Sequence, residues 1–179
     1  MQASGHKSLP TIGFLSVVDR DEQGFFGGYL ILNTRGRPIE FHCTAPVKPN
    51  KAQEILYGSS LKPYVYGEQI GQTLVSKAKE KPLFVCTDVG AVLDARQFVK
   101  TPIVLLLDQR VEYEANEIEP QNRFDIGEYK LAVAETFEKD QQVVASQWQT
   151  HADRLDLQEP FERIREAMNE AQRSARQAA

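Results

Sequence analysis

The sequence has little cysteine, little histidine and a single tryptophan among its 179 residues. Its two cysteines, Cys43 and Cys86, lie in different apolar segments without CxxC spacing, which argues against a structural zinc site and a redox motif. We therefore expect two reduced, buried thiols in a cytoplasmic protein. The histidines His6, His42 and His151 form no HExxH or HxxxH pair, so the sequence does not favour a histidine-rich metal site.

A broad excess of positive charge is also missing, because 21 Lys and Arg residues face 25 Asp and Glu residues. Such a chain cannot hold nucleic acid by a general basic field, so any contact with nucleic acid needs a local site. Long apolar runs are absent too: the longest, residues 102–107, falls far short of the ~20 residues that span a bilayer. The first ten residues are polar and do not resemble a signal peptide, so we expect no membrane partner.

What remains is the composition of a globular protein, with 41% hydrophobic and 26% charged residues. The length predicts a single domain. We assign residues 1–148 to one α/β domain, of which residues 1–10 form a flexible start, and residues 149–179 to a C-terminal helical extension.

The first third of the chain is rich in strand-forming residues. Residues 11–19, 25–33 and 39–45 are apolar and β-branched, and short polar turns separate them. Three consecutive strands with short turns predict an antiparallel meander.

The middle of the chain alternates helices with short buried strands. Asn50 can cap a helix that begins at Lys51, and a second helix is expected at residues 67–79. The apolar segments 83–87 and 103–107 flank a short helix at residues 90–99, which favours parallel pairing. The fold class is therefore α/β, with a mixed sheet in which the meander is followed by βαβ units.

The remaining segments are a possible strand at residues 111–115, a largely helical stretch at residues 127–148 and a helix from about Pro160. This last helix carries apolar residues at heptad-like spacing, namely Phe161, Ile164, Met168, Ala171 and Ala175. Two interpretations stay open: the helix packs on the domain, or residues 160–177 form a homodimer.

Three of the expected strands end in aspartate, at Asp19, Asp88 and Asp108. If these strands are parallel neighbours, their carboxylates meet at one edge of the sheet and repel one another unless a proton or a cation intervenes. Oxygen ligands suit Mg²⁺, Mn²⁺ or Ca²⁺. The alternative is that aspartate simply follows strands because it favours turns.

The order of these residues resembles the ribonuclease H-like superfamily, in its ribonuclease HI pattern, over residues 12–108. The resemblance rests on Asp19, Gly27-Gly28-Tyr29, Gly36-Arg37, Phe41, Asn50 with Glu54, and Thr87-Asp88. The sequence departs from that pattern directly after Asp19, where Arg20-Asp21-Glu22 replaces small residues.

The resemblance implies a nuclease site or an inactive relative of one. Asp19, Glu54 and Asp88 would hold two Mg²⁺ or Mn²⁺ ions that hydrolyse a phosphodiester. Asp108 and Asp125 compete for the place of a fourth acidic ligand.

Two further side chains, Asn50 and Tyr57, would contact the nucleic-acid substrate. The rival function is a non-catalytic interaction module that associates through its C-terminal helix. The two functions differ in one observable: a nuclease brings its three carboxylates within about 4–6 Å of one another, whereas a module leaves them apart and solvated.

Overall fold

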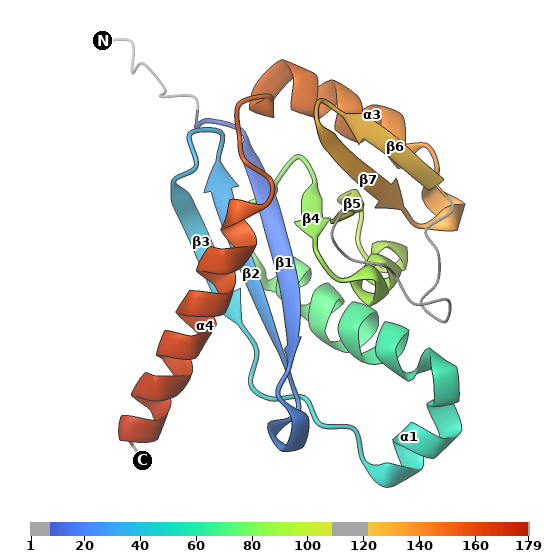
Figure 1. The fold of residues 1–179 in the computed structure, drawn as a ribbon, viewed down its shortest axis with the longest axis vertical. Helices are drawn as coiled ribbons and strands as arrows, with labels where there is room; N and C mark the ends of the chain where they lie inside the picture. The colour runs from blue at the N-terminus through green and yellow to red at the C-terminus, as the bar shows by residue number, and fades with distance from the viewer. Residues whose placement is uncertain (1–7, 109–121, 179) are drawn as a thin grey trace.

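The computed structural model describes residues 8–108 and 122–178, and its centre is one seven-stranded mixed sheet (Figure 1). The strand order is β3-β2-β1-β4-β5-β7-β6. The strands are β1 (Thr11–Asp19), β2 (Phe25–Asn33), β3 (Pro38–Cys43), β4 (Val85–Thr87), β5 (Ile103–Leu106), β6 (Asn122–Ile126) and β7 (Tyr129–Val133).

The pairing confirms the predicted α/β class and mixed sheet. Strands β1, β2 and β3 form the antiparallel meander, and β4 pairs parallel with both β1 and β5. The predicted bounds of the first two strands agree with β1 and β2, since their apolar residues run without interruption between polar turns.

The prediction that residues 127–148 are largely helical is wrong. Strands β6 and β7 form a hairpin whose turn contains Gly127 at a φ of +56°, and β7 pairs antiparallel with β5. Helix α3 (Asp140–Gln147) and the π-helical turn η6 (Trp148–Ala152) occupy only the end of this stretch. The possible strand at residues 111–115 lies outside the described residues.

Helix α1 (Lys51–Tyr57) begins where the capping signal predicts. The Asn50 side chain accepts a hydrogen bond from the Gln53 backbone N–H at 2.9 Å, and the Gln53 side chain accepts one from the Asn50 N–H at 3.0 Å. This reciprocal pair satisfies two of the amides that a helix start leaves open.

The next helical segment begins earlier than the predicted residue 67. It is π-helical as η3 (Pro63–Gln72), continues as α2 (Thr73–Lys77) and accommodates Pro63 in its first turn. The connection from β4 to β5 is the 3₁₀ helix η4 (Gly90–Gln97). Three short 3₁₀ turns complete this inventory: η1 (Asp21–Gln23), η2 (Gly58–Ser60) and η5 (Glu135–Phe137).

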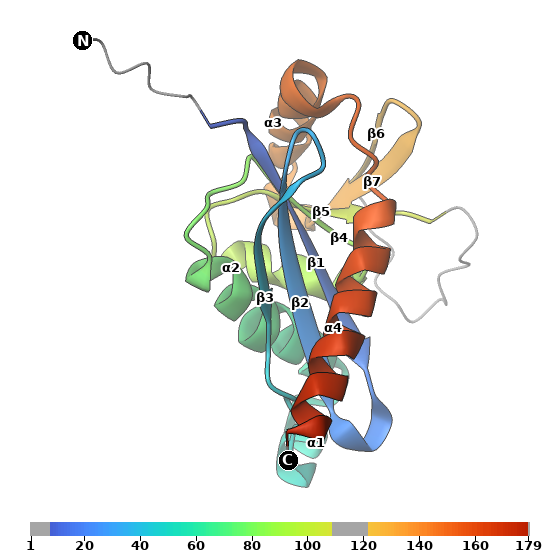
Figure 2. The same ribbon diagram turned by 90° about the vertical axis from the view of Figure 1, so that its left-hand side faces the viewer.

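Helices cover both faces of the sheet, as the view in Figure 2 shows. Alternate residues of β1 point to opposite faces. Phe14 packs edge-on against Phe161 of α4 (Glu159–Gln177), with ring centroids 5.7 Å apart, whereas Leu15 and Val17 join the core that η3, α2 and η4 cover.

Helix α4 packs on the sheet of its own chain, which agrees with the first of the two interpretations of the C-terminal helix. Its residues Phe161, Ile164 and Met168 are buried, whereas Ala171 and Ala175 are exposed. No helix in the described ranges is long and apolar enough to cross a membrane.

Candidate functional site

Asp88 lies at the end of β4, where three elements meet. Because Leu15 of β1 pairs with Thr87 of β4, Asp88 follows alongside Ser16. The Ser16 hydroxyl donates a hydrogen bond to Asp88 Oδ1 at 2.7 Å, and Arg165 Nη1 on α4 donates to Asp88 Oδ2 at 2.7 Å. The Asp88 carboxylate therefore joins β1, β4 and α4 and has partners on both oxygens.

Asp19 ends β1 three residues beyond Ser16. An odd offset along a strand places two side chains on opposite faces, so Asp19 and the Ser16–Asp88 pair lie on different sides of the sheet. Asp19 Oδ1 accepts a hydrogen bond from the Asp21 N–H at 2.9 Å and so stabilises the turn into β2. Burial, with the negative charge of Asp19 as a smaller cause, raises the pKa of Tyr66 to about 12.

The predicted residues on α1 are remote from this edge of the sheet. Glu54 is exposed, and its carboxylate lies 3.3 Å from the Lys51 ammonium. Asn50 is committed to capping the helix. The ring of Tyr57 stacks on that of Tyr64 with centroids 4.2 Å apart. Helix α1 extends away from the sheet in Figure 1.

The remaining predicted ligands belong to two other strands. Asp108 follows β5 and is half-buried, whereas Asp125 is exposed on β6. Within residues 8–108 and 122–178, no three His, Cys, Asp or Glu side chains are grouped so that they could hold a metal ion. The arrangement of these residues therefore does not fit a metal pair.

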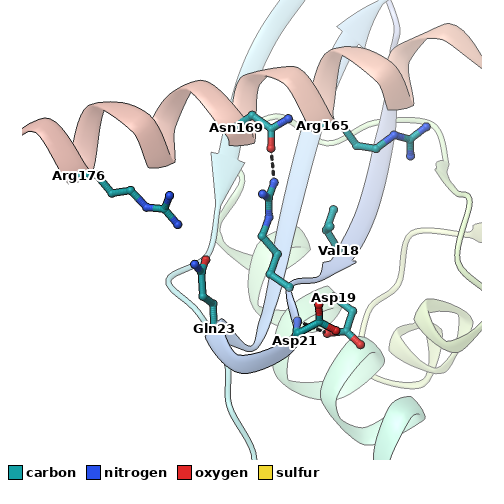
Figure 3. A pocket seen from close by; sticks show the side chains of 8 residues that line it. Val18, Asp19, Asp21, Gln23, Arg165, Asn169 and Arg176 are labelled. Carbon is teal, nitrogen blue, oxygen red and sulfur yellow. Dashed lines mark hydrogen bonds between the residues drawn. The ribbon is translucent and has the colours of Figure 1, made fainter.

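A groove that the sequence analysis did not identify lies between the β1–β2 turn and α4 (Figure 3). It has a volume of about 510 Å³. Its lining residues are Val18, Asp19, Arg20, Asp21, Gln23, Arg165, Asn169 and Arg176. A second hollow of about 240 Å³ shares Arg20, Asn169 and Arg176 and adds Gln172 and Arg173.

Four guanidinium groups and two carboxylates line this arginine groove, and one of the four, Arg165, is already paired with Asp88. The other three guanidinium groups still outnumber the two carboxylates. The Arg20 side chain reaches from the turn to α4, where it donates a hydrogen bond to Asn169 Oδ1. The Nε atom of Arg20 is buried and has no partner among the described residues.

The signal for the groove was present in the sequence. Arg165, Asn169, Gln172, Arg173 and Arg176 recur at helical spacing, so they share one face of α4. An analysis of the apolar residues alone finds the buried face of this helix and overlooks the polar one. The contribution of Arg20 depends on the packing of α4 beside the turn, which the sequence does not specify.

Neither a protein-family model nor a curated protein matches the chain. Among solved structures, one similar chain is described as endonuclease V (D234N) of Ciona intestinalis in complex with a 23mer DNA containing an inosine followed by a ribo-adenosine. The two chains share 12% identity with a TM-score of 0.38, and the match covers 59% of this chain and 48% of the other. A likeness of this size carries no argument about function.

Proposed function

We propose that the protein binds a nucleic-acid strand through its phosphates in the arginine groove between the β1–β2 turn and α4. The observation that carries the proposal is that four arginines from two elements line two hollows that share Arg20, Asn169 and Arg176. Guanidinium groups bind phosphate oxygens with paired hydrogen bonds, which suits them to this ligand. The site is local, as a chain of net charge −4 requires.

The dimensions favour a polyanion over a single free phosphate. From Arg165 to Arg176 the helix rises about 16 Å, at about 1.5 Å per residue. Phosphates on one strand of a duplex are spaced by about 3.4 Å along the axis, so this row matches about five of them. A free phosphate would use only one end of it.

The neutral polar side chains support the same ligand. Gln23, Asn169 and Gln172 line the groove between the charged groups. Amide side chains contact phosphates, sugars and bases in nucleic-acid complexes, and phosphate contacts position the strand. Asp19 and Asp21 at one end of the groove repel phosphate, so the strand would lie toward α4.

The more specific function that we propose is cleavage of the bound strand. It would require Mg²⁺ or Mn²⁺ at Asp19, Glu54 and Asp88, with Asp108 or Asp125 as a further ligand. Asp19 is among the residues that line the arginine groove, and Asp88 pairs with Arg165 of the same groove, whereas the Asp19 side chain points to the other face of the sheet. Hydrolysis would need the carboxylates to rearrange around the ions.

The binding test measures how a labelled oligonucleotide, longer than the groove, associates at several salt concentrations. Arg173→Gln/Arg176→Gln should weaken binding and reduce the slope of log affinity against log salt by about 1.4, at about 0.7 per lost contact to a single strand. The matched control is Arg37→Gln/Arg154→Gln, which removes the same charge from exposed residues outside the groove. Equal effects of the two double variants would contradict the proposal.

Cleavage is tested separately by incubating the same oligonucleotide with Mn²⁺ and the wild-type protein or Asp19→Asn/Asp88→Asn. Products that form only with the wild type support the nuclease form. Binding without products leaves a nucleic-acid-binding protein that does not cut this strand.

The rival module that associates through its C-terminal helix has less support. The apolar residues that would form its seam, Phe161, Ile164 and Met168, are already buried in the chain's own core. Only the small side chains of Ala171 and Ala175 remain exposed on that helix face.

A further inference from the structure

Strand β3 is the outer strand at one end of the sheet, and no described strand pairs with its outer side. It exposes three apolar side chains in alternation: Ile39 is 48% exposed, Phe41 is 37% exposed and Cys43 is exposed as well. The prediction that both thiols are buried is therefore wrong for Cys43 and right for Cys86. An edge strand with unpaired backbone groups and an apolar stripe can pair with another chain.

The stripe lies on the same face of the sheet as α4. Cys43 pairs with Gly28 of β2, and paired residues point to the same side. A Cβ atom on Gly28 would lie 2.5 Å from Ile164 and Met168, so this side is the one that α4 covers. Helix α4 packs over β1 and β2 and leaves the β3 stripe beside it uncovered.

The opposite face of β3 carries a glutamate and a histidine that contact each other. Glu40 Oε2 lies 2.7 Å from His42 Nε2, and both side chains are partly buried. The Glu40 carboxylate also accepts hydrogen bonds from the backbone N–H groups of Lys79 and Glu80. Glu40 and His42 are therefore held in place on either side of Phe41.

The free backbone groups of β3 follow from its pairing with β2. The Thr44 N–H donates to the Gly27 carbonyl at 2.9 Å, so residues 44, 42 and 40 direct their backbone groups toward β2. Phe41 and Cys43 lie between these positions and direct theirs outward.

We propose that β3 pairs antiparallel with β3 of a second copy of this chain, about a two-fold axis at Phe41. In this register the outward N–H and C=O of one Phe41 meet those of the other, and the two rings pack together. Glu40 of each copy lies opposite His42 of the other, and Ile39 lies opposite Cys43. Aromatic pairs across strands are stabilising, and a glutamate carboxylate can accept a hydrogen bond from a histidine ring N–H.

The positions of Glu40 and His42 favour this register over its neighbour. An axis at His42 would set the two histidines against each other and would separate each from the glutamates. Pro38 and Pro46 bracket the segment and offer no N–H to a further strand, and a register shift opposite Ile31 and Leu32 interrupts the ladder near Pro38. These features confine pairing to a short segment, which closes as a dimer.

The test uses the fact that position 41 faces itself. Phe41→Lys and Phe41→Glu should each be monomeric by sedimentation equilibrium at micromolar concentrations where the wild type dimerises, because like charges meet at the axis. An equal mixture of the two variants should form a heterodimer. A wild type that stays monomeric over this range, or a mixture that does not associate, would overturn the proposal.

The register is tested by disulfide formation. Paired Cα atoms of this type are about 5.5 Å apart, inside the range of about 4.4–6.8 Å that disulfides span. Phe41→Cys/Cys43→Ser should therefore cross-link to its own copy on mild oxidation. Wild-type Cys43 should not, since the two Cys43 residues would stand about 13 Å apart along the strands. Cross-linking of the wild type instead would show another register.

The β3 edge shares no residue with the arginine groove, so the dimer and the nucleic-acid site can be tested separately. Arg173→Gln/Arg176→Gln should dimerise like the wild type, and loss of nucleic-acid binding in that variant leaves the dimer untouched. If an extended peptide, and no second copy, occupies the β3 edge, the wild type will sediment as a monomer and the proposal fails.

Discussion

Arg165 of α4 and Asp88 at the end of β4 form an ion pair with 2.7 Å between Nη1 and Oδ2. The other carboxylate oxygen accepts the hydrogen bond from Ser16, whose side chain is buried in β1. One carboxylate thereby ties the last helix to two parallel strands, and its partner Arg165 lines the arginine groove.

Asp88→Ala should lower the free energy of unfolding by about 1.5–3 kcal/mol, because it removes a charged acceptor and leaves the buried Ser16 hydroxyl without its partner. Urea denaturation measures this, and Asp153→Ala at an exposed position is the matched control. If Asp88 instead lay in a cluster of repelling carboxylates, its removal would raise the free energy of unfolding. A more stable Asp88→Ala variant would therefore support the three-carboxylate site.

Alanine variants of Gly27 and Gly28 should test the helix packing on the two faces of the sheet separately. A Cβ on Gly27 would lie 2.2 Å from Ile70, and one on Gly28 would lie 2.5 Å from Ile164 and Met168. Each alanine variant should cost about 1–3 kcal/mol by overpacking. Gly28→Ala should also speed proteolysis within α4, whereas Gly27→Ala should not.

Gly90→Ala is the control for both glycine variants, since a Cβ there meets only Leu105 at 3.7 Å. Its stability should match the wild type within about 0.5 kcal/mol. If all three variants unfold alike, the close approach of the helices to β2 does not limit the packing.

Arg96 of η4 and Asp140 of α3 form a pair that is mostly shielded from water. The Arg96 Nε lies 2.7 Å from Asp140 Oδ2, and the two side chains are 17% and 9% exposed. Arg96 also donates to the Val99 carbonyl at 2.8 Å and lies 4.2 Å from the centre of the Phe137 ring.

Asp140→Ala should therefore lower the free energy of unfolding by about 3–5 kcal/mol, because it leaves a shielded guanidinium without its partner. The double variant Arg96→Met/Asp140→Leu should recover a large part of this loss, since no charge is then left unpaired. Both effects are measurable by urea unfolding, and a double variant less stable than Asp140→Ala would contradict the explanation.

The Glu40 carboxylate should make stability depend on pH below the ordinary range of glutamate. The hydrogen bond from His42, followed by that from the Glu80 N–H, lowers the pKa of Glu40 below its usual 4.5. A lowered pKa in the folded state stabilises the protein above pH 4.5, and this contribution is lost as the pH falls through the lowered pKa.

The measurement compares the unfolding midpoint of the wild type with that of Glu40→Gln between neutral and acid pH. The wild type should be the more stable at neutral pH, and the difference should shrink in the acid range. The same substitution at the exposed Glu170 is the matched control. A difference that does not change with pH would show that the Glu40 charge is not the cause.

The strands of the meander could be predicted because their sequence carries the signal locally. Residues 11–19 and 25–33 are mostly apolar stretches between polar turns, so their composition indicates burial on both faces of the sheet. The β6–β7 hairpin was harder to predict, because the spacing of Phe124, Ile126 and Leu131 suits a helix as well as a strand. The turn at Gly127 is what decides for a hairpin.

The site was less predictable because it depends on which face each side chain takes. The expected strand ends pointed to Asp19 and Asp88. The offset of three residues from Ser16 to Asp19 shows that Asp19 and Asp88 lie on opposite faces, but only once the register of β1 and β4 is known. Likewise, the resemblance associated Glu54 with these acids, whereas a seven-residue helix carries it away from the sheet.

The packing of α4 on β1 and β2 also bears on how quickly the chain can fold. Arg163 donates to the carbonyl of Gly36 across 127 residues of sequence, and Arg20 reaches Asn169 across 149. Contacts between segments so distant in sequence form only after long loops have closed, and proteins rich in them fold slowly. One face of the sheet therefore stays open to solvent until nearly the whole chain has been ordered, and this interval is when its apolar strands are most exposed to aggregation.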